Sequence, residues 1–172
     1  FAAKFKYSSA AKSVHHSFVG GLLEHSLSVT RLCMHYCSKY KLLNYDLLIT
    51  AALLHDIGKT VELSSFPEND YTDEGQLLGH IIIGLDIISK AIARIDKFPP
   101  TLANELKHCI AAHHGELEYG SPKKPALIEA MALNLADNTD AKLQTFTEII
   151  EASSGMGKEW LGYNRFFESN IR

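Results

Sequence analysis

The sequence predicts an all-α protein. Helical periodicity dominates the spacing of apolar residues, and no internal repeat or low-complexity tract interrupts it. The hydrophobic fraction of 46% and the charged fraction of 22% are ordinary for a globular protein. A length of 172 residues suits one domain with a sizeable core. We therefore expect a single domain over residues 1–172, made of about five main helices.

The apolar periodicity and the turn residues give the expected order of elements. We expect helices over residues 15–40, 46–57, 73–95, 100–114 and 125–152. Gly58 is a plausible C-terminal stop for the second helix, and the proline pair at 99 and 100 can start the fourth. The least helical stretch predicts a short irregular or hairpin insertion near residues 60–72. The aromatic tail after Gly157 is expected to fold back on the core.

Charge, cysteine content and hydropathy exclude several classes of protein. The net charge of −3 gives no overall basic character, so any grip on RNA or DNA must be local. The odd, small number of cysteines does not predict a disulfide framework. We expect small packing residues in a reducing compartment at Cys33, Cys37 and Cys109. No apolar segment looks long enough to span a membrane, and no signal-peptide pattern opens the chain. We expect a cytoplasmic protein without a membrane partner.

Seven residues of the types that bind metals fall at expected helical positions. They are His25, His55, Asp56, His80, His113, His114 and Asp137. Imidazole nitrogens and carboxylate oxygens are good ligands for a borderline divalent metal. Unpaired buried charges are costly, so this many polar residues on apolar helices call for a shared explanation. A metal held by such ligands can activate water and clamp a phosphoryl oxygen, which predicts a metal-dependent phosphohydrolase.

The adjacent pair His55 and Asp56 constrains where such a site can lie. Neighbouring residues on a helix point about 100° apart, so both can reach one site only if it lies between their directions. That position suits a carboxylate that bridges two metals while the imidazole binds one. Lys59 can reach over the same site, where its ammonium would pair with a substrate phosphate.

The order of these residues resembles a known family. A histidine, a His-Asp pair and a later aspartate, here His25, His55 with Asp56, and Asp137, are similar to the core of the HD superfamily of metal-dependent phosphohydrolases. The intervening His80 and the His113–His114 pair resemble its two-metal branch. Longer stretches resemble the catalytic domain of YhaM-type 3′→5′ exoribonucleases, over roughly residues 4–145. These stretches are residues 10–16, 20–29, 53–59, 75–80 and 113–122.

The resemblance implies a fold, cofactors and partners. It implies an HD-domain helical bundle that uses two divalent ions, manganese first and iron, nickel, magnesium or zinc as alternatives. The substrate would be single-stranded RNA, with DNA or a nucleotide as alternatives. An N-terminal OB-type nucleic-acid-binding domain is expected in a full-length form and not within residues 1–172. A homo-oligomer is compatible with this assignment.

The resemblance and the positions of single residues together suggest a mechanism with a role for each residue. The first ion would be held by His25, His55, Asp56 and Asp137, and the second by Asp56, His80, His113 and His114. A hydroxide between the ions would attack the terminal phosphodiester. Catalytic roles fall to Asp56, Lys59 and His114. Expected substrate contacts are His15, His16, Lys59, Tyr119, Lys123 and Lys124, and residues that could orient ligands are Asn134, Asn138 and Asp140.

Two other functions remain open on the sequence. An HD phosphohydrolase acting on small nucleotides or cyclic dinucleotides would use the same ligands and release phosphate, pyrophosphate or nucleotides. A non-catalytic nucleotide-binding HD module would have a broken ligand set, whereas this set is intact.

Overall fold

The computed structural model describes residues 2–12, 18–153 and 159–172, and these residues are mainly helical, as the sequence predicted. The α-helices are α1 (Ala2–Tyr7), α2 (Gly21–Lys39), α3 (Tyr45–Leu54), α4 (Lys59–Glu62), α5 (Asp73–Ile92), α6 (Pro100–Ala111) and α7 (Ile128–Ala152). A single 3₁₀ turn, η1 (Leu117–Tyr119), lies between α6 and α7. Two short strands, β1 (Gly162–Asn164) and β2 (Ser169–Ile171), pair antiparallel near the C-terminus.

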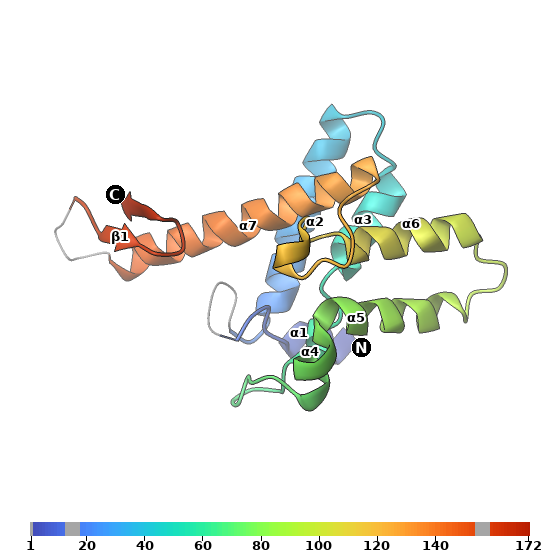
Figure 1. Ribbon diagram of the computed structural model, residues 1–172, viewed down its shortest axis with the longest axis horizontal. Coiled ribbons are helices and arrows are strands. Elements are labelled where there is room, and N and C mark those ends of the chain that lie inside the picture. Colours follow the sequence, from blue (N-terminus) through green and yellow to red (C-terminus); the bar gives the residue numbers. More distant parts are fainter. Residues whose placement is uncertain (1, 13–17, 154–158) are drawn as a thin grey trace.

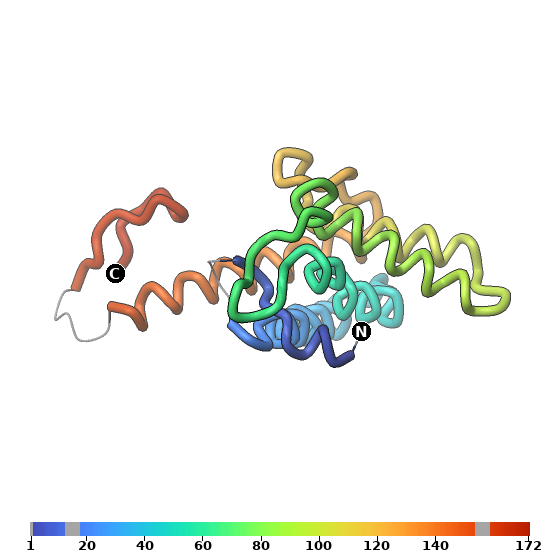
Figure 2. Tube along the Cα trace, turned by 90° about the horizontal axis from the view of Figure 1, so that it is seen from below, coloured from blue at the N-terminus to red at the C-terminus, as the bar shows by residue number. Residues whose placement is uncertain are grey.

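The helices form a bundle whose core lies where α2, α3, α6 and α7 meet. Figure 1 shows α7 crossing α2, with α5 and α6 side by side at one end of the molecule and the strand hairpin at the other. The tube view in Figure 2 shows the same separation of hairpin and α5–α6 pair. Fully buried side chains of the core include Val29, Leu48, Ile110 and Leu133, one from each of the four helices. This core fixes the four helices relative to one another.

The start of α3 is tied to α7 by polar contacts at the edge of this core. The Asn44 side-chain oxygen accepts a hydrogen bond from the Leu47 amide at 3.1 Å, which caps the helix. The Asn44 amide in turn donates to Glu129 Oε1 at 2.7 Å. The cap therefore fixes where α3 begins, and with it the position of His55 and Asp56, which follow the other end of the helix.

Several helix ends differ from those that the periodicity predicted. The helix expected from residue 15 begins at Gly21, after Gly20 turns the chain with a φ of 89°. The helix expected to residue 57 ends at Leu54, and the one expected to residue 114 ends at Ala111. Both of the latter stop just before a pair of metal-type residues. The turn after a helix can also bury apolar residues at the helical spacing. The spacing alone therefore does not show where the helical hydrogen bonds stop.

Gly58 allows a close approach between the chain after α3 and α5. Its φ of −63° and ψ of −25° are helical, and α3 already ends at Leu54, so Gly58 is not the C-terminal stop that was expected for that helix. A Cβ at this position would lie 1.9 Å from the His80 carbonyl oxygen and 2.7 Å from the Gly84 amide nitrogen. Only glycine lets the two backbones lie this close.

A second glycine bends α5 beside this contact. Gly79 has a φ of 70° and a ψ of 158° inside the helix, in a region that other residues rarely adopt. The bend comes one residue before His80. It sets the direction in which the second half of α5 leaves the metal-type residues.

By length and composition, α5 could cross a membrane, which corrects the expectation that no segment is apolar enough. Its most apolar window has a mean hydropathy of 1.3, with 28% of that window buried. The exposed apolar side chains Leu77, Leu78 and Ile82 contribute to this value. The helix also begins with two acidic residues, carries His80 and packs on α4 and α6. Its composition therefore does not separate a membrane span from a helix of the bundle.

The insertion and the tail also take definite forms. The stretch near residues 60–72 starts with the short α4 and closes with one antiparallel bridge between Leu63 and Tyr71, close to the irregular or hairpin segment expected. The tail forms the β1–β2 hairpin, which contacts the end of α7 through Phe146 and Phe167. Among the described residues, no side chain of this hairpin belongs to the core cluster, so the expected return to the core is wrong.

We expect Gly58→Ala to destabilise the fold, because the added methyl group must push apart two backbones that a side-chain rotation cannot relieve. The cost should be roughly 1–3 kcal/mol in the free energy of unfolding, as for overpacked cores. Gly84→Ala is the matched control, because its Cβ would lie 3.5 Å from the Gly58 nitrogen, an ordinary contact. Urea unfolding followed by circular dichroism would measure both. Equal stability of the two variants would contradict the close-approach argument.

Candidate metal centre

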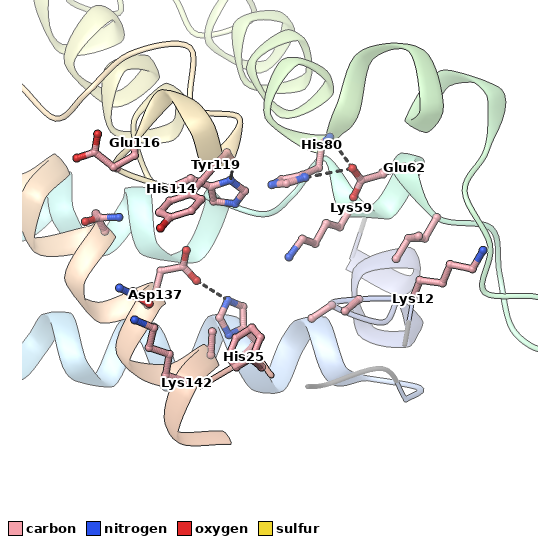
Figure 3. A pocket seen from close by; sticks show the side chains of 18 of the residues that line it. Lys12, His25, Lys59, Glu62, His80, His114, Glu116, Tyr119, Asp137 and Lys142 are labelled. Carbon is pink, nitrogen blue, oxygen red and sulfur yellow. Dashed lines mark hydrogen bonds and ion pairs between the residues drawn. The ribbon is translucent and has the colours of Figure 1, made fainter. Parts of the chain in front are cut away.

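The structure brings all seven metal-type residues to one cavity beside the core. His25 lies in α2, His55 and Asp56 directly after α3, His80 in α5, His113 and His114 directly after α6, and Asp137 in α7. The cavity has a volume of about 1020 Å³. Figure 3 shows His25, Lys59, His80, His114 and Asp137 around it. Three of the seven are almost wholly buried behind these, namely His55, Asp56 and His113.

The helical placement predicted for the two pairs is wrong, and the difference has a chemical consequence. Helical hydrogen bonding stops before each pair, so backbone carbonyl oxygens near the helix end are left for other donors. His55 Nδ1 lies 2.8 Å from the Ala52 carbonyl oxygen, and His113 Nδ1 lies 2.7 Å from that of Ile110. In both cases the histidine contacts the carbonyl three residues before it.

The other three histidines of the site are held in the same way. His25 Nδ1 lies 2.7 Å from Asp140 Oδ2, His80 Nδ1 lies 3.1 Å from Glu62 Oε1, and His114 Nδ1 lies 2.7 Å from the Tyr119 carbonyl oxygen. A carbonyl or carboxylate oxygen only accepts, so each Nδ1 carries the hydrogen. When the ring is neutral, its Nε2 is then left with a lone pair for a metal, which is the usual arrangement of metal-binding histidines.

One group of ligand atoms comes from His25, His55 and Asp137, whose atoms all lie within 4.8 Å of one another. His25 Nε2 lies 3.1 Å from Asp137 Oδ1 and 3.2 Å from His55 Nε2. Two neutral Nε2 lone pairs at this distance would repel, so the contact requires either a proton, which His25 carries without metal, or a metal ion between the nitrogens. An ion about 2.1 Å from each nitrogen would make the contact favourable.

The second group consists of His80, His113 and His114, again with ligand atoms within 4.8 Å of one another. His80 Nε2 and His113 Nε2 are buried and have no hydrogen-bond partner among the residues that the structure describes. Unpartnered buried nitrogens are rare because each costs the full desolvation of the group. Burial lowers the pKa of both His113 and His114, so both are neutral and able to bind a metal at neutral pH.

Asp56 lies between the two groups with one oxygen toward each. Its Oδ2 lies 3.4 Å from His55 Nε2, and its Oδ1 lies 3.4 Å from His80 Nε2. Oδ1 is a further buried atom without a hydrogen-bond partner among the described residues. Burial opposes the charge, but the Lys59 ammonium and His55 hold the pKa of Asp56 well below its usual range. The carboxylate is therefore ionised and positioned as a bridge.

Lys59 lies over this carboxylate, as its spacing predicted. Its Nζ is 2.7 Å from Asp56 Oδ2, and the side chain lines the cavity. Burial opposes its charge, but Asp56 more than compensates and raises the pKa of Lys59 above its usual value. Lys59 is therefore a permanent cation in the lining of the cavity.

Two carboxylates behind the ligands orient them. Glu62 Oε1 accepts from the His80 amide at 2.9 Å as well as from the His80 ring. Asp140 accepts from the Ser28 hydroxyl in addition to the His25 ring. Sequence reasoning singled out Asp140 but missed Glu62, whose partner is 18 residues away in the chain. A glutamate next to an expected loop carries no signal of that pairing.

The remaining candidates are distributed unevenly. Tyr119, Asn134 and Asn138 line the cavity, and Asn134 also donates to the His113 carbonyl oxygen at 2.8 Å. Lys123 and Lys124 are not among the residues that line it, and Lys124 pairs with Glu116 at 2.5 Å. His15 and His16 lie outside the described residues.

A comparison with known protein families identifies the family of this chain. The HD domain model matches residues 22–142, a range that contains all seven metal-type residues. The chain belongs to the HD family. As a member of this family of metal-dependent phosphohydrolases, the HD domain uses divalent metal ions, and both ligand groups offer donors that suit them.

The HD domain is also similar to curated proteins named 3′-5′ exoribonuclease YhaM. It is 41% identical over 147 residues to that of Geobacillus sp. (strain WCH70), which covers 86% of this chain and 45% of the relative. It is 41% identical over 151 residues to that of Bacillus subtilis (strain 168), covering 87% and 47%. It is 40% identical over 142 residues to that of Listeria innocua serovar 6a, which covers 83% of this chain and 45% of the relative. The chain thus spans a little under half of each relative. No solved structure matches it significantly.

Glu62→Gln is expected to weaken the binding of metal at the second group. The amide can still accept from the His80 backbone, but it loses the charge that holds the ring. Loss of such an outer partner typically costs about 10- to 100-fold in metal affinity. Glu116→Gln is the control, because Glu116 also lines the cavity but pairs with Lys124. Isothermal titration with Mn²⁺ would measure both, and unchanged affinity in Glu62→Gln would exclude the orienting role.

Metal affinity at the first group should rise with pH. Burial opposes protonation of His25, but the hydrogen bonds that its ring donates to Asp137 and Asp140 outweigh burial and raise the pKa of His25 to about 9. A proton must therefore leave before a metal binds, which weakens apparent affinity about tenfold for each pH unit below the pKa. Titrations at several pH values would show affinity increasing from about pH 7 and levelling above about pH 9. A flat profile across this window would contradict the protonated state of His25.

Proposed function

We propose that this HD domain is a metal-dependent phosphodiesterase that removes nucleotides from the 3′ end of single-stranded RNA. The observation that carries the hydrolytic part is the ionised carboxylate of Asp56, which lies behind the cavity lining with one oxygen facing each histidine group. The polymer and the direction are supported by relatives named 3′-5′ exoribonuclease, about 41% identical over most of the chain.

The proposed cofactors are two divalent ions, with manganese as the first choice. His25, His55 and Asp137 would hold one, and His80, His113 and His114 the other, with Asp56 shared between them. Ions bound there would supply Lewis acidity toward the phosphoryl group and lower the pKa of the attacking water. Mixed imidazole and carboxylate donors fit manganese, iron, nickel, magnesium or zinc, and cellular supply also selects among them.

Residues of the chain would then position the substrate and compensate the charge of its phosphate. Lys59 pairs with a phosphoryl oxygen of the substrate, because its ammonium already lies at the cavity wall beside Asp56. His114, whose Nδ1 is held by the Tyr119 carbonyl oxygen, directs Nε2 either to the second ion or to the leaving oxygen. The Tyr119 side chain lines the cavity and can contact the substrate.

Other substrate contacts form part of the same proposal. Lys123 and Lys124 would act at the outer loop, away from the cavity lining, where Lys124 must first leave Glu116. His15 and His16 are proposed substrate contacts as well. The two lysines would contact the strand outside the metal centre, and so affect binding more than the chemical step.

The wider assembly is also proposed. The relatives extend over more than twice the matched length, which leaves room in those proteins for an N-terminal nucleic-acid-binding domain. Such a domain and a homo-oligomer would both lengthen the contact with RNA. The cytoplasm is the proposed location, and the free cysteines Cys33, Cys37 and Cys109 suit its reducing conditions.

A gel assay with end-labelled single-stranded RNA tests this function. Mn²⁺ should produce stepwise shortening of the 5′-labelled strand and early release of a labelled mononucleotide from the 3′-labelled strand, and EDTA should stop both. Asp56→Ala should abolish cleavage and bound metal together, by more than the roughly 100-fold effect of an outer partner. Full activity in that variant would overturn the proposal. Bound metal with no RNA cleavage, but release of phosphate or pyrophosphate from nucleotides, would replace RNA by a small nucleotide as substrate.

A further inference from the structure

The tip of the C-terminal hairpin reaches the cavity of the metal centre. Phe166, Phe167 and Glu168, between β1 and β2, line the same cavity as Lys59 and Asp137. Figures 1 and 2 show the hairpin beside the C-terminal end of α7. It lies outside residues 22–142, the range of the HD domain match. The hairpin therefore lies beyond the matched range of the HD domain, with its tip at the edge of the cavity.

Several contacts hold the tip in place. Asn164 Oδ1 accepts from the amides of Phe166 at 2.9 Å and Phe167 at 3.3 Å, which closes the turn. Phe167 packs edge-on against Phe146 of α7, with ring centroids 5.0 Å apart. Ile171 of β2 is 1% exposed. The hairpin is thus anchored by Phe167 and Ile171.

Phe166 differs from these anchors because it is 57% exposed. Its ring stands at 86° to that of Phe167, with centroids 5.0 Å apart, so an aromatic neighbour supports it from one side. An exposed phenylalanine at a rigid tip, in a cavity that also contains a phosphate-hydrolysing site, offers a flat face to a planar group. Single-stranded nucleic acids bind proteins largely by stacking bases on such rings.

The helix α7 sets the spacing between Phe166 and the metal centre. Phe146, on which the hairpin rests, follows Asp137 by nine residues, which corresponds to roughly 13 Å along the helix. Stacked nucleotides advance about 3.4 Å each. A strand with its 3′ end at Asp137 would therefore bring about its fourth base to the hairpin.

A cation lies between the two ends. Lys142 is exposed, lines the cavity, and forms no ion pair with the residues that the structure describes. It precedes Phe146 by four residues, so the two share one face of α7. Figure 3 shows the Lys142 side chain beside Asp137 and His25. A basic residue followed by an aromatic platform is the combination that grips a single strand by phosphate and base.

We propose that Phe166 stacks on a base of the single-stranded substrate about four nucleotides from its 3′ end, with Lys142 contacting a phosphate between that base and the metal centre. This inference rests on the proposed function and extends it to the strand behind the cleaved bond. It makes the domain sensitive to substrate length, since a mononucleotide or dinucleotide cannot reach the hairpin.

Phe166→Ala tests the platform, with Tyr163→Ala as the matched control. Tyr163 lies on the same hairpin and is 65% exposed, but it does not line the cavity. Fluorescence anisotropy in EDTA would measure binding of single-stranded RNA of about two, four and eight nucleotides, chosen around the expected position of the platform. Loss of one stacked base should weaken binding of the longest RNA by roughly 5- to 100-fold and remove the gain in affinity beyond about four nucleotides. Phe166→Trp should restore both.

Hydrolysis of bis(p-nitrophenyl) phosphate with Mn²⁺ separates this inference from the proposed function. Phe166→Ala should hydrolyse this small diester like the parent chain. Absence of hydrolysis in the parent chain would count against the proposed function, while length-dependent binding in EDTA would still support the platform. Equal affinity of Phe166→Ala and the parent for the longest RNA would overturn the inference. So would an equal loss in Tyr163→Ala, because the hairpin would then act only through its folding.

Lys142→Gln provides a second readout. Loss of one phosphate contact should flatten the dependence of the logarithm of affinity on the logarithm of salt concentration by about 0.7, the value for one charge on a single strand. Lys39→Gln, at the end of α2 and outside the cavity lining, should leave that slope unchanged. An unchanged slope in Lys142→Gln would remove the phosphate contact from the proposal.

Discussion

The buried charge of Asp56 is the constraint on which the rest of the centre depends. A carboxylate that is 2% exposed is costly unless opposite charges or metals surround it. Lys59 compensates it at one oxygen, and histidines from α5 and the turns after α3 and α6 face it on both sides. The bundle must bring these elements together at the depth of its core. The close approach at Gly58 and the bend at Gly79 are the local features that make this possible.

The histidines of the centre solve a second problem, which is orientation. An imidazole can rotate and can carry its hydrogen on either nitrogen, so its position alone does not make it a ligand. Here each Nδ1 faces an oxygen, supplied by a helix-end carbonyl, a loop carbonyl or a carboxylate. Ligand geometry is thus built into the backbone at His55 and His113, and into partner side chains at His25 and His80. The orientations that metal binding would need are thus set by the chain's own contacts.

The spacing of apolar residues predicted the all-α fold, and the few residue types that bind metals identified the ligand candidates. The division of these candidates between two ions came from the family resemblance. Other features depended on information that is not local. Apolar side chains continue the helical period up to His55 and His113, so the sequence pattern did not reveal that α3 and α6 end before these residues. The pairing of Glu62 with His80 links positions that only the fold brings together. The β1–β2 hairpin is short and is anchored mainly by Phe167 and Ile171. The sequence did not distinguish its exposed aromatic residues from residues that pack into the core.

The carbonyl contacts at the ends of α3 and α6 tie the length of each helix to the chemistry of the cavity. Adding or deleting one residue in α3 would turn its end by about 100° and carry His55 and Asp56 away from their partners together. The loops at residues 64–70 and 93–99 lie outside this coupling and can change length without moving a ligand. Variation in length among related chains should therefore accumulate in those loops, while the intervals from Asn44 to His55 and from Pro100 to His113 stay constant.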